Sequence, residues 1–264
     1  MIARSLLSAA LALTTCGVAA DGAEYLARKF AGPAGKTLPY RLLGPVEVEK
    51  GKRYPLVVLL HGYGERGTDN EKPIKAANSG ASLFLLSDVR KKYPCFVAVP
   101  QAPDVWVAEP DFHVNTPFRT QPQDSILLVG LLIPALAREH PIDLDRVVLM
   151  GFSNGGCGVW DLLVRAPAMF AAAVVISGAG DPARAALGKQ VPTWVFHGAK
   201  DKTVPVARAH DMIAALKKSG GRPQYTEYPG AAHGDTPLKA HKEAELLPWM
   251  FAQRRGKPAV STKR

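Results

Sequence analysis

The stretch VVLMGFSNGGCGVWDLL, residues 147–163, passes from an apolar run through a serine flanked by glycines into an amphipathic segment. The apolar run is typical of a buried strand, and the segment after it is typical of a helix. Gly151-Phe152-Ser153-Asn154-Gly155 fits G-x-S-x-G, in which the glycines permit a sharp turn where a Cβ would collide with the neighbouring element. The pattern predicts that Ser153 stands above the end of the strand as a nucleophile.

Apolar runs and amphipathic segments alternate along the rest of the chain. This alternation predicts a mostly parallel sheet with helices on both faces, in one α/β domain over residues 21–254. Pro134 is expected to kink the helix predicted over residues 121–140, and the short connection between the sixth and seventh strands leaves room for little or no cap domain. The expected strands are 24–30, 36–45, a run from Tyr54, 95–103, 146–152, 170–178, 191–198 and 222–230, and the expected helices are 79–92, 121–140, 154–166, 182–188, 205–219 and 238–254.

The residues just after each strand are the candidates for chemistry, because ligands bind at the carboxyl ends of strands in open α/β sheets. A serine needs a base to take its proton, and His233 in the loop YPGAAHGDTP is the expected one. Asp201, after the preceding strand, is the expected orienting carboxylate, with Asp235 as the alternative. His61 and His197 each precede a glycine at the end of a strand, where buried structural hydrogen bonding is expected.

Two backbone N–H groups are expected to bind the oxyanion of the reaction. One belongs to Asn154, at the amino end of the helix after the serine, and the other to Tyr63 in the glycine-rich loop HGYGERG. Trp106 and Phe112, after the fourth strand, are candidate substrate-binding residues forming an apolar wall, with ordinary packing under a long loop as the alternative. Asp161 is expected to face solvent or pair locally.

Five segments occur in a characteristic order: LLHGYGERG, GFSNGG, WDLLVRAPAMFAAAVVISG, WVFHGAKDKTVP and YTEYPGAAH. Together they resemble the secreted α/β-hydrolase esterases grouped with polyhydroxybutyrate depolymerase-like and feruloyl-esterase-like proteins, over about residues 36–252. The resemblance implies the α/β-hydrolase fold, a triad of Ser153, Asp201 and His233, and Tyr63 and Asn154 as oxyanion donors. These esterases commonly have Met where this chain has Asn154, so the resemblance does not carry over a substrate.

The first twenty residues, MIARSLLSAALALTTCGVAA, have the pattern of a secretory signal peptide, with a lipoprotein site at Cys16 as the lesser alternative. No other segment is long and apolar enough to cross a membrane. Cys95 and Cys157 are expected to be buried free thiols, with a bridge between them as the alternative. No segment has the spacing of a metal site, and no metal or other cofactor is expected.

The chain has a formal net charge of +10, much of it near the C-terminus. Residues 255–264 are expected to form a basic flexible tail, and there is no recognisable nucleic-acid-binding module, so no nucleic-acid partner is expected. The basic residues of the terminal stretch QRRGKPAVSTKR, residues 253–264, are Arg254, Arg255, Lys257, Lys263 and Arg264.

These observations predict a secreted or periplasmic serine esterase. The expected substrates are small-molecule or polymer-attached esters with short acyl or aromatic groups, some of them on polysaccharides. A peptidase of the prolyl-oligopeptidase type is the alternative, although such enzymes usually carry an extra domain. A non-catalytic binding protein on the same fold is a further alternative. Such a protein would be expected to have lost a triad residue, and none is missing here.

Overall fold

The computed structural model describes residues 24–108 and 121–257. Within these residues, eight strands form one sheet in the order β1-β2-β4-β3-β5-β6-β7-β8. The pairs β1–β2 and β2–β4 are antiparallel, and all pairs from β4 to β8 are parallel. The predicted mostly parallel sheet is confirmed. The strands are β1 (Leu26–Ala31), β2 (Thr37–Leu43), β3 (Tyr54–Leu60), β4 (Phe96–Pro100), β5 (Ile142–Phe152), β6 (Ala172–Ile176), β7 (Thr193–Gly198) and β8 (Gln224–Tyr228).

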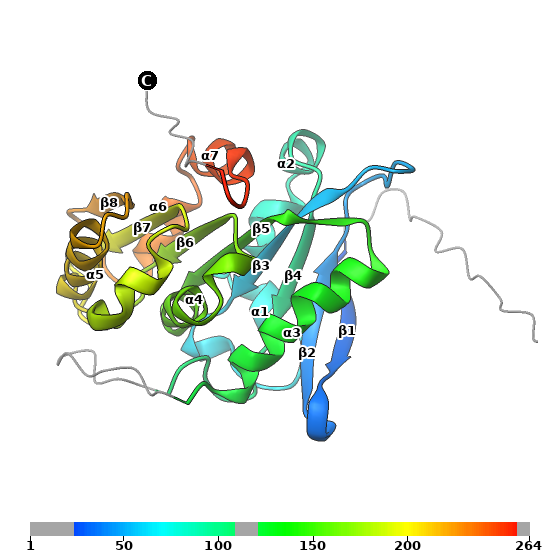
Figure 1. Cartoon of the computed structure of the whole chain (residues 1–264), viewed down its shortest axis with the longest axis horizontal. Coiled ribbons are helices and arrows are strands. Elements are labelled where there is room, and N and C mark those ends of the chain that lie inside the picture. Colours follow the sequence, from blue (N-terminus) through cyan, green and yellow to red (C-terminus); the bar gives the residue numbers. More distant parts are fainter. Residues whose placement is uncertain (1–23, 109–120, 258–264) are drawn as a thin grey trace, which may run out of the picture.

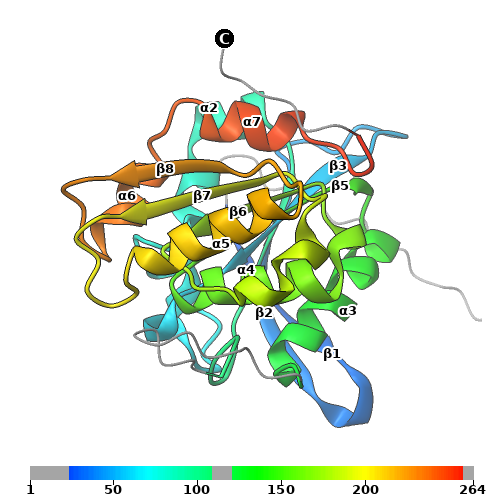
Figure 2. The same cartoon turned by 60° about the vertical axis from the view of Figure 1, so that its left-hand side comes forward.

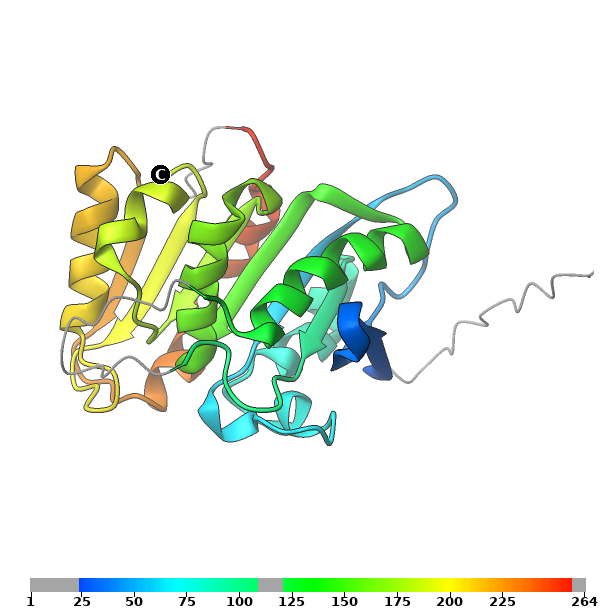
Figure 3. The same cartoon turned by 60° about the horizontal axis from the view of Figure 1, so that its bottom comes forward.

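Helices cover both faces of the sheet, as Figures 1 and 3 show. The helices α3, α4 and α5 pack on one face, and α2, α6 and α7 pack on the other. The two layers of helices bury β3, β4, β6 and β7 along their whole length. The helices are α1 (Lys72–Lys75), α2 (Ser87–Lys92), α3 (Asp124–Glu139), α4 (Asn154–Arg165), α5 (Ala207–Lys218), α6 (Asp235–Ala240) and α7 (Leu246–Ala252).

The core consists of two clusters, one on each face of the sheet. Successive strand residues point to opposite faces, so in β5 Leu149 joins the cluster under α3, α4 and α5 while Met150 joins the other. Cys157 lies in the first cluster and Cys95 in the second, and both are free buried thiols. The expectation of unbridged thiols is therefore confirmed, because the sheet stands between them.

Three predicted helices differ from the observed elements. The expected helix 238–254 is two short helices, α6 and α7, because each turns its own apolar residues onto the same face of the sheet. The expected helix 79–92 begins as a 3₁₀ turn, Ala81–Leu85, before α2. The segment 182–188 is a 3₁₀ helix throughout. The helix α3 continues through Pro134 to Glu139.

The C-terminal segment returns to the start of β5. Arg254 pairs with Asp143 and Asp145, and Arg255 pairs with Asp145, so the beginning of the basic segment contacts the domain. The expected signal peptide (1–20), Cys16 and residues 258–264 lie outside the described residues. No helix in the described parts of the chain has the length and apolar character needed to cross a bilayer.

Candidate active site

Ser153 stands at the sharp turn between β5 and α4. Its backbone has φ 56° and ψ −122°, a conformation that costs energy for any residue with a side chain. The Ser153 N–H donates to the Ile176 carbonyl of β6 at 2.9 Å, which fixes the turn against the neighbouring strand. A Cβ on Gly151 would overlap the Gly155 carbonyl, and a Cβ on Gly155 would overlap the Leu60 carbonyl of β3. The close approach of α4 to the sheet therefore depends on these glycines.

Ser153, His233 and Asp201 form one continuous hydrogen-bonded chain. His233, in the loop after β8, places Nε2 2.8 Å from Ser153 Oγ and Nδ1 2.7 Å from Asp201 Oδ2. A carboxylate only accepts, so His233 Nδ1 carries a proton and Nε2 is free to accept the proton of the serine hydroxyl. The strands β7 and β8, which end just before Asp201 and His233, run in the same direction (Figure 2). The Phe152 ring lies 4.9 Å from the imidazole of His233, centroid to centroid, and supports it.

The buried Asp201 carboxylate is fully provided with donors. Its Oδ1 accepts the backbone N–H groups of Thr203 and Val204 at 2.9 and 2.8 Å. Burial alone would raise the pKa of Asp201, but N–H groups of His197, His233 and Val204 outweigh it and hold this pKa well below its usual range. The carboxylate therefore stays ionised and can stabilise a positive charge on His233.

The alternative carboxylates make other contacts. Asp235 Oδ2 accepts the backbone N–H of Ala232 at 2.9 Å, which is the contact of a turn residue. Asp161 is buried in α4 and accepts from Arg165 Nε at 2.7 Å, in agreement with the expected local pairing. Within the described segments, no three His, Cys, Asp or Glu side chains are arranged to hold a metal ion.

The loop after β3 carries Tyr63 and starts beside α4, where a Cβ on Gly155 would overlap the Leu60 and His61 carbonyls. Neither the N–H of Tyr63 nor that of Asn154 donates to another described residue, so both remain available to an oxyanion. The Tyr63 side chain is exposed. The Arg66 guanidinium lies 3.8 Å from the Tyr63 ring and donates to its carbonyl at 2.9 Å, which steadies the short turn Tyr63–Glu65.

His61 fastens this loop to the loop that follows β4. Its Nδ1 donates to the Gly62 carbonyl at 2.7 Å, and its Nε2 accepts the Ala102 N–H at 3.0 Å, so the ring is neutral. Burial lowers the pKa of His61 to about 4. Gln101 adds a second link, donating from Nε2 to the Glu65 carbonyl at 2.9 Å. His61 thus has the buried structural role expected from the sequence.

Trp106 does not form an exposed wall beside the serine. Its side chain is fully buried, and its indole N–H donates to the His61 carbonyl at 2.9 Å. The expectation of a substrate-binding Trp106 is therefore corrected in favour of the packing alternative, because the indole needs both an apolar enclosure and an acceptor. Phe112 lies outside the described residues.

The side chain of Asn154 has a role that the sequence did not indicate. Its Oδ1 accepts the Trp106 backbone N–H at 2.8 Å, and its Nδ2 donates to the Val107 carbonyl at 3.1 Å. The carboxamide therefore holds the chain after β4 against the amino end of α4. Only knowledge of which loop lies beside residue 154 could have revealed this contact.

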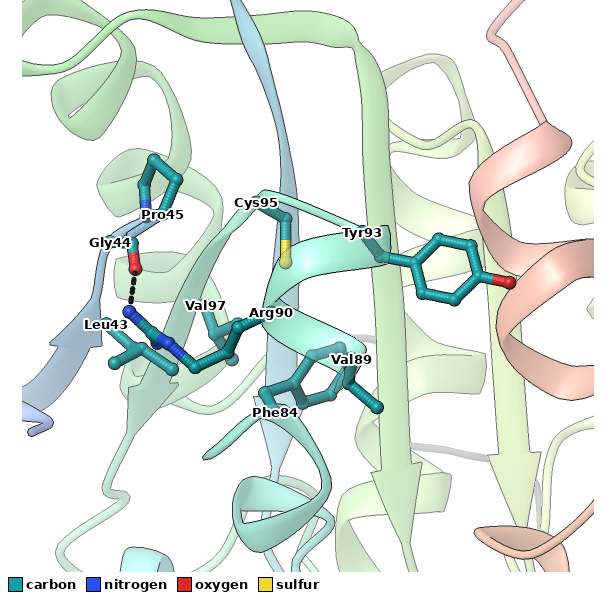
Figure 4. A pocket seen from close by; sticks show the side chains of 9 residues that line it. All are labelled: Leu43, Gly44, Pro45, Phe84, Val89, Arg90, Tyr93, Cys95 and Val97. Carbon is teal, nitrogen blue, oxygen red and sulfur yellow. Dashed lines mark hydrogen bonds between the residues drawn. The ribbon is translucent and has the colours of Figure 1, made fainter. Parts of the chain in front are cut away.

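The connection between β6 and β7 is short. Residues 177–192, between β6 and β7, contain only the short 3₁₀ helix Pro182–Gly188, so no cap domain is inserted there. A small hollow beside Cys95 is drawn in Figure 4, where Arg90 donates to the Gly44 carbonyl at 3.2 Å. Cys95 precedes β4, whereas Ser153 follows β5. The hollow therefore lies at the amino ends of the parallel strands, and the candidate site lies at their carboxyl ends.

This sheet order, with a serine at a strained strand-to-helix turn and a histidine and an aspartate after the last two strands, defines an α/β-hydrolase. The phospholipase/carboxylesterase family pattern matches residues 44–239, and the chain belongs to this family of ester hydrolases. The predicted relationship to α/β-hydrolase esterases is thereby confirmed.

Solved structures extend the comparison. A thermostable esterase is 34% identical, with a TM-score of 0.79 over 88% of this chain and 63% of that one. An acylaminoacyl peptidase from Pyrococcus horikoshii is 15% identical, with a TM-score of 0.66 over 90% of this chain and 43% of that one. A ferulic acid esterase is 17% identical, with a TM-score of 0.62 over 87% of this chain and 98% of that one. The last two show the fold alone. No curated protein matches the chain.

Proposed function

We propose that this chain hydrolyses carboxylic esters through an acyl-enzyme formed on Ser153. The observation that carries the proposal is the hydrogen-bonded chain from Ser153 Oγ through His233 to the buried Asp201, with the serine on a strained turn. A hydroxyl is a weak nucleophile on its own, and this arrangement supplies both the base and the group that orients the base.

The proposed reaction follows from the contacts. Ser153 Oγ attacks the ester carbonyl while His233 Nε2 takes its proton. The Tyr63 and Asn154 N–H groups bind the oxyanion, and the ionised Asp201 stabilises the imidazolium. His233 then protonates the leaving alcohol, and water attacks the acyl-enzyme with His233 again as base. Each step of this sequence uses only protein groups and water.

The proposed substrates are esters with short acyl or aromatic groups, either small molecules or groups attached to a polymer such as a polysaccharide. The short connection between β6 and β7 supports this choice, because it brings no cap domain over the serine from that side. The family to which the chain belongs and the thermostable esterase that it resembles support an ester over an amide.

We propose further that residues 1–20 direct export to the periplasm or the exterior, as their sequence pattern favours. Expression of the full chain in a bacterial host, followed by N-terminal sequencing of the exported protein, tests this. A mature protein beginning near Asp21 would support export, an acylated Cys16 would support the lipoprotein alternative, and an intact Met1 would contradict both.

Substitution of the nucleophile tests the proposed chemistry. Ser153→Ala should lower the turnover of p-nitrophenyl acetate by about 10⁴-fold or more while leaving the circular dichroism spectrum unchanged. Ser219→Ala, at the end of α5, should keep wild-type turnover. Turnover retained by folded Ser153→Ala protein would refute the assignment.

A substrate panel separates the proposed function from its alternatives. Acetyl, feruloyl and medium-chain p-nitrophenyl esters are compared with peptide anilides, and a fluorophosphonate probe labels a reactive serine. Faster hydrolysis of the anilides would favour the peptidase. Failure of the probe to label Ser153, together with absence of turnover, would favour a non-catalytic protein.

A further inference from the structure

His197 is a fully buried imidazole next to the candidate active site. It is the penultimate residue of β7, four positions before Asp201. Val195, two residues earlier, belongs to the core cluster under α4 and α5, so His197 points to that same face of the sheet. Burying a polar ring is costly unless its N–H is paired, so its contacts indicate what it does.

One ring nitrogen of His197 faces two acceptors at once. Its Nε2 lies 2.8 Å from the Val204 carbonyl oxygen and 3.3 Å from Asp201 Oδ2. Both acceptors lack a proton to give, so Nε2 carries the proton. The other nitrogen, Nδ1, is buried and has no hydrogen-bond partner among the described residues. With no acceptor beside Nδ1, the ring donates through Nε2.

The two histidines approach the same carboxylate oxygen. His233 donates to Asp201 Oδ2 at 2.7 Å, and the His197 Nε2 is the second, longer contact at that atom. The Val204 residue links both ends of this arrangement, since its N–H donates to Asp201 Oδ1 while its carbonyl accepts from His197. His197 therefore fixes the loop that holds Asp201 and also faces the carboxylate itself.

We propose that His197 is a positioning residue for Asp201, an imidazole that fastens the Val204 carbonyl and turns its Nε2–H toward the oxygen that orients His233. The inference rests on the proposed function, because it assigns a role in the reaction of that site. His197 touches no substrate. It acts by withdrawing negative charge from Oδ2, which sets how strongly Asp201 attracts the proton on His233 Nδ1.

The other titratable groups around His197 have partners of their own. Glu227 stands opposite His197 in the register of β8, and its Oε2 is bound by His210 of α5 at 2.7 Å and by the Tyr225 hydroxyl at 2.6 Å. The loop after β7 contributes Asp201, and His233 lies beyond it. A change in the pH profile of a His197 variant therefore reports on the Asp201–His233 pair.

Two variants separate donation from packing. His197→Leu removes the Nε2–H donor and fills the space of the imidazole with an apolar side chain of similar size. His197→Gln retains an N–H donor. In His197→Leu, kcat/KM for p-nitrophenyl acetate should fall about tenfold, and the acid limb of its pH profile should move to higher pH, because Asp201 then stabilises the imidazolium of His233 more strongly. His197→Gln should restore the wild-type limb.

His241→Leu is the matched control, because His241 is another largely buried histidine with an unpartnered Nε2, outside the hydrogen-bonded chain from Ser153 to Asp201. Its acid limb should remain that of the wild type. A His197→Leu enzyme that loses thermal stability but keeps the wild-type limb would show that His197 only packs, and would overturn the proposal.

A measurement on the unmodified protein decides the question if His197→Leu fails to fold. Nitrogen-15 imidazole spectra of the wild type should show a proton on Nε2 of His197 at the pH of the ester assay. A proton on Nδ1 alone would leave nothing to donate to Asp201 and would overturn the inference. Wild-type protein that folds but hydrolyses no ester would instead contradict the proposed function, and the spectra would still report the His197 tautomer.

Discussion

Ser153, His233 and Asp201 differ in how much of each side chain reaches solvent. Asp201 has none of its side chain exposed, whereas His233 has 18% exposed. A carboxylate shielded from water attracts its partner more strongly than one at the surface, while the histidine must be reachable to exchange protons with water and the leaving group. The exposed fractions of these two side chains therefore match the proposed roles of Asp201 and His233.

Acid should destabilise the fold through its buried neutral histidines. Burial lowers the pKa of His61 and of His241 to about 4, from the ordinary value of 6.5. Below pH 6.5 these histidines bind protons in the unfolded chain but remain unprotonated in the folded protein, so the free energy of unfolding falls as the pH drops. This loss is complete below about pH 4.

His241→Leu isolates one of these contributions. Between pH 7 and about pH 4.5, the variant should lose about 2 kcal/mol less unfolding free energy than the wild type, because His61 acts equally in both. Urea unfolding at the two pH values measures the difference. An equal loss in both proteins would mean that His241 is already protonated in the folded state.

Asn154 offers a second prediction at this scale. Asn154→Met keeps the backbone N–H proposed for the oxyanion but leaves the Trp106 N–H and the Val107 carbonyl without partners. Unfolding free energy should fall by about 1–3 kcal/mol, while turnover of p-nitrophenyl acetate should persist. Thermal unfolding and an ester assay check the two parts. Loss of turnover as complete as that in Ser153→Ala would show that the carboxamide itself acts in the reaction.

At the scale of elements, α4 is the helix that determines the site. It begins directly after Ser153, and two of its first residues, Gly155 and Gly156, lie so close to β3 and β6 that a side chain is excluded at both positions. A Cβ on Gly156 would lie 2.9 Å from Gly178 Cα, just after β6. The position of the Asn154 N–H, which we propose to bind the oxyanion, therefore depends on how closely this helix docks.

Gly155→Ala should prevent this docking. Its Cβ would overlap the Leu60 carbonyl of β3, and the backbone cannot yield without moving α4. We expect a loss of about 3 kcal/mol or more of unfolding free energy and loss of ester turnover. The control is Gly130→Ala in α3, where nothing lies within 4 Å of the added Cβ.

Gly130→Ala should raise stability by about 0.5–1 kcal/mol, since alanine favours the helix. Denaturant unfolding of both variants makes the comparison. Equal stabilities would show that α4 can shift away from β3 without cost.

The elements that the sequence predicts well are those with a local signal. The run from Val147 to Phe152 and the glycines around Ser153 identify a strand, a turn and a helix without further information. The prediction of a single helix over 238–254 was wrong. The residues of this segment favour helix throughout, but packing on the sheet imposes the break between α6 and α7. Local propensity carries no information about that surface.

The same distinction applies to the candidate site. Chain order was enough to select Asp201 and His233, whose side chains the structure brings together with Ser153. The sequence did not decide between a substrate wall and ordinary packing for Trp106, and it indicated buried hydrogen bonding for His197 without identifying Asp201 as its neighbour. The burial of Trp106 and the contact of His197 with Asp201 both depend on which loops lie side by side in the fold, and a single sequence does not show this.

At the scale of the whole molecule, the sheet divides the core into two separate apolar clusters. Each cluster contains one buried free thiol, Cys95 in one and Cys157 in the other. Burial raises the pKa of Cys95 to about 12, so little reactive thiolate exists in the folded protein. The two thiols therefore report on opposite halves of the core.

Protein beginning at Asp21 should react with a disulfide reagent only as fast as it unfolds. Both thiols should be modified together if the two clusters open in one cooperative step. The single variants Cys95→Ser and Cys157→Ser measure each rate separately. Adding a reductant should leave the melting temperature unchanged, since no bridge exists. Rapid modification of one thiol in the native state would show that its half of the core opens independently.

The left-handed backbone at Ser153 has a further consequence. A free peptide of residues 147–163 would contain every atom of the turn, yet nothing would hold its serine in a conformation that an isolated chain avoids. The docking of α4 on the sheet supplies that force. The proposed reactivity of Ser153 toward esters therefore requires the completed fold. A partly folded molecule would contain the serine but would not hold it in the reactive conformation.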